Sequence, residues 1–221
     1  MKLVVLGASG GIGRHLVADA VSRGHAVTAV VRPETPFDAP VGQGSVTVIR
    51  DDVLRPGAIA GAVAGADAVL SSLGVKRRTP ANPWSTLVSP PDFASSTARS
   101  IVAAMREARI RRVIAVSAAG VAESGPRMNA VMRALVARSN IGVAYRDLAV
   151  MEQVYADSGL DACCVRPVTL TSGARSPSGS GRVRAVDRFG ATMSIARADV
   201  AAWMLDHLAD PELPRTIQLA G

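Results

Sequence analysis

The sequence predicts an α/β fold built on a doubly wound parallel sheet, and three observations lead to this prediction. Short apolar runs rich in β-branched residues alternate with helix-like segments from the N-terminus to about Val165. The apolar runs are almost uninterrupted, as in strands that helices cover on both faces. The chain has 221 residues, of which 48% are hydrophobic, so one core can form and we expect a single domain over residues 1–221.

Each element is assigned from its residue pattern and from the residues that end it. The expected strands are Lys2–Leu6, Ala26–Val31, Val46–Ile49, Ala68–Leu73, Arg112–Ser117 and Ala162–Val165. The expected helices are Gly11–Ser22, Ala58–Val63, Pro91–Ala108 and about Ala144–Asp157. Gly24, Gly65 and Gly159 lie close to the ends of three of these helices, where glycine commonly terminates the helical conformation.

The alternation of strands and helices stops after Pro167. The stretch "TSGARSPSGSGRVRAV" is rich in turn residues, and "SIARADVAAWMLDHL" indicates a helix that begins near Arg197–Asp199. Thr216–Leu219 is expected to form a short last strand. We therefore expect residues from about 168 to 200 to form a small C-terminal region on the substrate side of a ligand site, within the same domain.

Composition argues against a membrane protein and a metalloprotein. No window reaches the ~18 uninterrupted apolar residues that a spanning helix needs, and the chain starts on a strand-like run instead of a signal segment. The two cysteines, Cys163 and Cys164, are neighbours in an apolar strand, so we expect buried thiols and neither a disulfide nor a metal site. A cytoplasmic protein without a membrane partner is expected.

The net charge of +7 raises the alternative of nucleic-acid binding. The charge comes mostly from arginines scattered through the chain, and only 3% of residues are aromatic, which leaves little for bases to stack on. We therefore expect a small-molecule substrate, no nucleic-acid partner, and a monomer or small homo-oligomer.

The stretch "LGASGGIGRHL" carries three regularly spaced glycines, Gly7, Gly10 and Gly13, between the first strand and the first helix. In this context the first glycine permits a tight turn, the second lets the backbone approach a pyrophosphate, and the third lets the helix pack on the strand. The pyrophosphate would lie at the helix N-terminus. We expect the cofactor to contact the three glycines and their neighbours Ser9, Gly11, Ile12 and Arg14; the alternative is a tight turn without a ligand.

Arg32 lies at the end of the second strand, where a site for NAD would carry an acidic residue that binds the ribose 2′-hydroxyl. A guanidinium instead pairs with the 2′-phosphate of NADP, and Ser9 and Arg14 can add contacts to it. The sequence thus favours NADP(H), although a solvated arginine at a strand end is the alternative interpretation.

The glycine spacing resembles that of the atypical short-chain dehydrogenase/reductases, as do "VVR" ending the second strand, "DDV" after the third and "SSLG" ending the fourth. "SIVAAMREARIRRVIAVSA", "DSGLDACCVRP" and "ARADVAAWML" extend the resemblance over nearly the whole chain. It is most similar to the NmrA-like NAD(P)H-binding branch, which includes biliverdin reductase B, also a flavin reductase. The resemblance implies a Rossmann-like fold, in which Asp52 and Val53 border the adenine, Leu73 and Gly74 pass the ribose and pyrophosphate, and Ser117 lies near the nicotinamide.

The chain departs from that superfamily at the catalytic positions. Conventional members use a tyrosine and a lysine four residues later, but Ala149 and Gly159 follow Tyr145 and Tyr155 at that distance. Thr169 also stands where the flavin reductase would have a histidine.

Two hydroxyl groups remain as catalytic candidates. Ser117 is expected to orient the hydride acceptor or to cap a strand end, and Tyr145 to donate a proton at an ordinary pKa or to pack a helix.

Hydride transfer without an activated acid requires an acceptor that stabilises its own negative charge. Flavins, quinones, conjugated enones and linear tetrapyrroles meet this requirement, because their hydride adducts are delocalised anions. We therefore expect an NADPH-dependent reductase of a conjugated, apolar small molecule. The alternatives are a non-catalytic NADP-binding sensor or regulatory protein, and an isomerase or epimerase that uses the nicotinamide transiently or as scaffold.

Overall fold

The computed structural model describes residues 1–79, 81–177, 183–190 and 192–221. Its larger sheet contains β1 (Lys2–Leu6), β2 (Ala26–Val31), β3 (Ser45–Arg50), β4 (Ala68–Ser71), β5 (Arg112–Val116), β6 (Asp161–Pro167), β8 (Arg184–Ala185) and β10 (Thr216–Ala220). Their spatial order is β3-β2-β1-β4-β5-β6-β10-β8, and all neighbours pair in parallel except β10 with β8. The direction of strand progression reverses between β1 and β4, and ligands of such sheets bind at the carboxyl ends of the strands beside this point.

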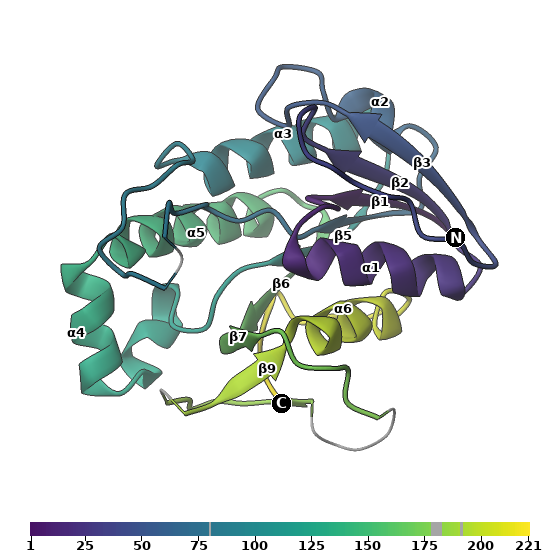
Figure 1. Cartoon of the computed structure of the whole chain (residues 1–221). Coiled ribbons are helices and arrows are strands. Elements are labelled where there is room, and N and C mark those ends of the chain that lie inside the picture. The colour runs from purple at the N-terminus through teal and green to yellow at the C-terminus, as the bar shows by residue number, and fades with distance from the viewer. Residues whose placement is uncertain (80, 178–182, 191) are drawn as a thin grey trace.

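Helices cover both faces of this sheet. On one face α1 (Gly11–Ser22) packs against α6 (Arg197–Asp206), and on the other α3 (Phe93–Glu107) packs against α5 (Ile141–Ala156), with α2 (Ala60–Val63) beside α3. Figure 1 shows α1 and α6 side by side on the near face of the sheet. The expected doubly wound, Rossmann-like fold is confirmed.

The strand sequence explains why two cores form. Successive side chains of a strand point to opposite faces, and in β1 Leu3 and Val5 join the core beneath α1 and α6, while Val4 and Leu6 join the core beneath α3 and α5. All four side chains are almost fully buried. An uninterrupted apolar run is therefore what this sheet requires.

A smaller parallel sheet of β7 (Thr169–Thr171) and β9 (Ser194–Ala196) lies within the region expected to be on the substrate side. Residues 178–182 and 191 of that expected region lie outside the described residues. A 3-10 helix, η1 (Ala122–Arg127), and α4 (Ala130–Arg138) lie between β5 and α5, and Figure 1 shows α4 at the edge of the molecule. Neither was expected from the sequence, and α4 contains no buried residue that would mark an apolar stripe.

The amino-terminal end of α3 is held by a side chain from another helix. Asp147 of α5 is buried and accepts hydrogen bonds from the backbone N–H groups of Ala94 (2.6 Å) and Ser95 (3.0 Å). These donors have no partner inside α3. Asp147 thereby fixes α5 against α3, and α5 carries part of the candidate site.

Among the described residues, no helix is long and apolar enough to cross a membrane.

Candidate cofactor and substrate site

A cavity of about 850 Å³ opens at the carboxyl ends of β1, β4 and β5. It brings together most residues predicted from the sequence: its lining includes Gly7, Ser9, Gly10, Gly11, Ile12, Arg32, Asp52, Val53, Leu73, Gly74, Ser117 and Tyr145. The other two predicted residues, Gly13 and Arg14, are not part of the lining. The cavity thus connects the glycine loop and the end of β2 with the proposed catalytic hydroxyls.

The glycine loop has the geometry of an anion cradle. Gly7 adopts a φ of 78°, and its carbonyl accepts a hydrogen bond from the Gly10 N–H at 2.9 Å. A Cβ atom at Gly13 would lie 2.1 Å from the Gly7 carbonyl oxygen and 2.8 Å from the Ala8 Cα, so the helix approaches the loop too closely for any side chain there. Gly13 therefore shapes the loop from beneath without lining the cavity.

The N-terminus of α1 presents free backbone N–H groups. No side chain of the described residues caps the helix, and its first turn contains no acidic residue. The first N–H groups of a helix have no partner within it, and their positive end favours an anion. A dinucleotide pyrophosphate fits this end of the cavity.

Arg32 follows β2 and is exposed at the rim of the cavity, and its guanidinium makes no hydrogen bond or ion pair with the described residues. Arg14 and Arg50 hold the backbone that follows it: Arg14 donates to the Pro36 carbonyl at 3.2 Å, and Arg50 to the Thr35 carbonyl at 2.9 Å. Arg14 also donates to the carbonyl of Ser9 in the glycine loop at 3.0 Å, so it links the two loops. Its guanidinium is bonded to backbone carbonyls, and Arg14 is not among the residues that line the cavity.

The residues expected beside the adenine follow β3. Val53 is buried and lines the cavity, whereas the Asp52 carboxylate accepts a hydrogen bond from the N–H of Leu54 at 3.0 Å and thereby forms a local turn. The neighbouring Asp51 pairs with Arg55, whose hydrogen bond lowers the pKa of the Asp51 carboxyl. This side of the cavity is shaped by turns with satisfied carboxylates.

Ser117 belongs to a polar cluster in which Glu152 and Arg166 are also buried, whereas the fourth member, Glu123, is exposed. The Ser117 hydroxyl donates to Glu152 Oε1 at 2.6 Å, and Arg166 binds both oxygens of Glu152 at 2.9 and 2.5 Å. Arg166 also binds both oxygens of Glu123, at 2.5 and 3.1 Å. Because the single proton of Ser117 is bonded to a carboxylate, the serine oxygen offers lone pairs and no donor to a ligand.

Tyr145 lines the same cavity as Ser117 and lies on α5, seven positions before Glu152. Its hydroxyl donates to the Ala119 carbonyl at 3.0 Å, and burial raises its pKa above the ordinary value of 10.0. Both proposed catalytic hydroxyls are therefore bonded to protein acceptors, and both are poor proton donors in this arrangement.

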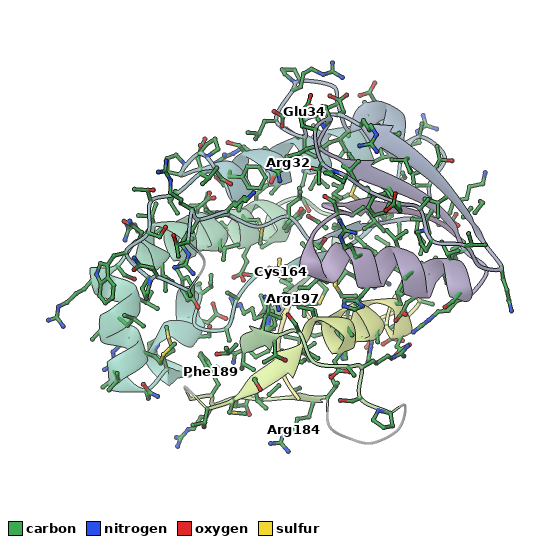
Figure 2. All side chains as sticks on the ribbon, in the orientation of Figure 1. Arg32, Glu34, Cys164, Arg184, Phe189 and Arg197 are labelled. Atoms are coloured by element: carbon green, nitrogen blue, oxygen red, sulfur yellow. The ribbon has the colours of Figure 1, made fainter. Side chains whose placement is uncertain are left out.

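Arg197 is a site residue that sequence reasoning did not find. It is the first residue of α6 and lines the cavity beside the glycine loop. A Cβ atom at Gly11 would lie 2.6 Å from its Cδ. Figure 2 shows Arg32 and Arg197 on either side of the N-terminal end of α1. No sequence signal links position 197 to the glycine loop, because only the packing of α6 on α1 brings them together.

The other end of the cavity is mainly apolar. Its lining includes Phe93, Met128, Met132, Ile141, Leu148, Val168, Leu170 and Phe189, with Lys76 and Arg77 among the charged residues. Met128 and Phe189 form an isolated β-bridge, so residues distant in the chain meet at this wall. This end of the cavity therefore offers mainly apolar surface to a ligand.

The described residues contain no group of three His, Cys, Asp or Glu side chains that could hold a metal ion. Cys163 and Cys164 are free and buried on opposite faces of β6, in the two different cores. Burial raises the pKa of both thiols, that of Cys163 to about 12. The buried thiols expected from the sequence are confirmed.

Comparison with solved structures agrees with the fold. ChuY, an anaerobillin reductase from Escherichia coli O157:H7, superposes with a TM-score of 0.76 at 24% identity over 99% of this chain and 96% of that chain. A short-chain dehydrogenase/reductase from Veillonella parvula in complex with NADP has a TM-score of 0.74 at 20% identity over 100% and 94%.

Sequence comparison identifies the family. The isoflavone reductase homolog IRL of Zea mays is 35% identical over 80 residues, which are 33% of this chain and only 26% of that protein. The profile of the NAD(P)H-binding family matches residues 7–211, from the first glycine of the loop to beyond α6. The chain therefore belongs to the NAD(P)H-binding family.

Proposed function

We propose that the protein is an NADP(H)-dependent reductase of a conjugated, apolar small molecule. The observation that carries the preference for NADP is Arg32, an exposed guanidinium at the end of β2 without a partner among the described residues. Arg14 and Arg50 hold the backbone beside it and add positive charge. A 2′-phosphate binds such a group strongly, whereas the neutral 2′-hydroxyl of NAD does not.

The residues present fit the whole cofactor. The uncapped N-terminus of α1 and the glycine loop would hold the pyrophosphate. Val53 would border the adenine, and Leu73 and Gly74 would lie beside the ribose. The nicotinamide would then lie near Ser117, next to the apolar end of the cavity. When bound, the reduced nicotinamide supplies a hydride, and the protein orients the acceptor and excludes water.

The hydroxyl groups support an acceptor that needs no strong acid. Ser117 donates its proton to Glu152, and Tyr145 donates its proton to a backbone carbonyl with a raised pKa. Neither group is poised to protonate the alkoxide that forms from an isolated ketone. A flavin, quinone, conjugated enone or linear tetrapyrrole delocalises the charge, so solvent can supply the proton afterwards.

Because the hydroxyls of Ser117 and Tyr145 both donate to protein acceptors, one alternative is also favoured, a protein that binds NADP without turning it over. The absorbance of NADPH, followed with FMN, a quinone and a conjugated enone as acceptors, separates the two. A reductase oxidises NADPH faster than NADH with at least one acceptor. Tight NADPH binding without oxidation over the whole panel would support the sensor and contradict the reductase. Isotope transfer from labelled NADPH that returns to the cofactor would indicate the isomerase or epimerase.

A further inference from the structure

We propose that Arg197 binds the cofactor pyrophosphate from the side opposite the glycine loop. This inference rests on the proposed NADP(H) site and adds a residue to it. Arg197 belongs to the C-terminal part of the chain, whereas the predicted cofactor residues come from the glycine loop and from the ends of β2 to β5.

The packing of α6 on α1 places the Arg197 side chain across the beginning of α1. A Cβ atom at Gly11, the first residue of α1, would lie 2.6 Å from Arg197 Cδ and 2.9 Å from its Nε. Only a residue without a side chain at position 11 allows this approach. The guanidinium consequently lies beside the free N–H groups of the helix N-terminus.

The electrostatics of this arrangement favour an anion. A cation beside the positive end of a helix dipole is unfavourable by itself. In the described part of the chain no carboxylate pairs with Arg197, whose guanidinium donates only to the neutral Ser172 hydroxyl, at 3.1 Å. Nearby Arg175, in contrast, pairs with Asp19 at 3.2 Å. A pyrophosphate between the Arg197 guanidinium and the α1 N–H groups satisfies both sets of donors.

Arg32 and Arg197 would then contact different parts of the cofactor. The 2′-phosphate near Arg32 occurs only in NADP, whereas the pyrophosphate near Arg197 occurs in both NADP and NAD. Removing Arg197 should therefore weaken both cofactors by the same factor. Removing Arg32 should weaken NADP alone.

The test measures the dissociation constants of NADP and NAD by titration calorimetry for the wild-type protein and for Arg197→Ala, Arg32→Ala and Arg175→Ala. We expect Arg197→Ala to weaken both cofactors about tenfold or more, the effect of one lost charge-assisted hydrogen bond. Arg175→Ala removes the same charge from a neighbouring residue that does not line the cavity, so it should leave both constants within about twofold. Arg197→Gln retains a long polar stem over Gly11 and should show the same loss if the alanine variant does not fold.

The outcomes separate this inference from the proposed function. Unchanged affinities in Arg197→Ala or Arg197→Gln, or a loss confined to NADP, would overturn the role of Arg197 while leaving the NADP site intact. Failure of the wild-type protein to bind either dinucleotide would overturn both. Binding that depends on Arg197 without any NADPH oxidation would overturn the reductase proposal alone.

Discussion

Replacing Arg166 by Met tests whether the cluster behind Ser117 is a buried ion network. The Arg166 side chain is 3% exposed and binds Glu152, whose side chain is 7% exposed, and Glu123, whose side chain is 62% exposed. Removing the guanidinium leaves the Glu152 carboxylate buried, and among the described residues only the Ser117 hydroxyl still donates to it. Breaking a buried pair in this way costs about 3–5 kcal/mol, because the remaining charge is uncompensated.

The structure places the expected cost at the lower end of that range. A cavity of about 250 Å³ is lined by Glu123, Glu152 and Arg166, so water can reach the freed carboxylate. We expect a loss of about 3 kcal/mol in the free energy of unfolding. For a domain of this size that lowers Tm by roughly 6–12 °C.

Urea and thermal unfolding of Arg166→Met measure this loss, with Arg23→Met as the matched control. Arg23 pairs with Asp206 at 2.7 Å, but the two side chains are 29% and 50% exposed, so its removal should cost less than about 1 kcal/mol. The double variant Arg166→Met with Glu152→Leu should recover stability, since no buried charge remains unpaired. Equal losses in Arg166→Met and Arg23→Met would refute the network.

The native protein should not react with iodoacetamide at pH 8, since burial raises the pKa of Cys163 and Cys164. Reaction of the thiols should begin only when urea unfolds the protein. Rapid labelling of the native state would contradict this burial. Tyr145→Phe should reduce the rate of NADPH oxidation less than about tenfold and leave its pH profile unchanged, because the phenol is bonded to a carbonyl; a loss of 10²–10⁴-fold would instead identify a general acid. The hydrogen bond that Glu123 accepts from Arg166 lowers the pKa of the Glu123 carboxyl below 4.5. The stability that Glu123 contributes is therefore complete above pH 4.5 and is lost as pH falls through the folded pKa. The stability difference between the wild-type protein and Glu123→Gln should therefore shrink below pH 4.5, and a difference independent of pH would contradict the pairing.

The sequence predicts the sheet well because its determinants are local. An apolar run such as Leu3–Leu6 can be buried only between two layers of helices, and every strand expected before Pro167 is found, with bounds that differ by at most two residues at either end. The spacing of Gly7, Gly10 and Gly13 likewise predicts the turn and its helix, because Gly7 supplies the positive φ and Gly13 the close approach that the turn needs. The α4 helix was missed because it buries no residue, so no apolar stripe marks it.

The polar contacts of the site depend on tertiary packing and could not be read from local pattern. The hydroxyl of Ser117 meets Glu152, which is 35 positions away, and the side chain of Arg197 meets Gly11 across two packed helices. Arg14 has the residue type and the position expected of a cofactor ligand, yet its guanidinium is bonded to backbone carbonyls. Residue type and strand order therefore predict where the site lies. The hydrogen-bond partner of each polar side chain can be assigned only once the three-dimensional fold is known.

The most direct test of the proposed reductase activity is a single-turnover experiment with NADPH deuterated at the transferred position. The enzyme is mixed with labelled or unlabelled NADPH and with FMN, and the nicotinamide absorbance is followed. We expect that the absorbance decays, that deuterium slows the decay, and that NADH under the same conditions reacts more slowly. Bound NADPH whose absorbance stays constant with FMN, a quinone and a conjugated enone would contradict the proposed reductase activity.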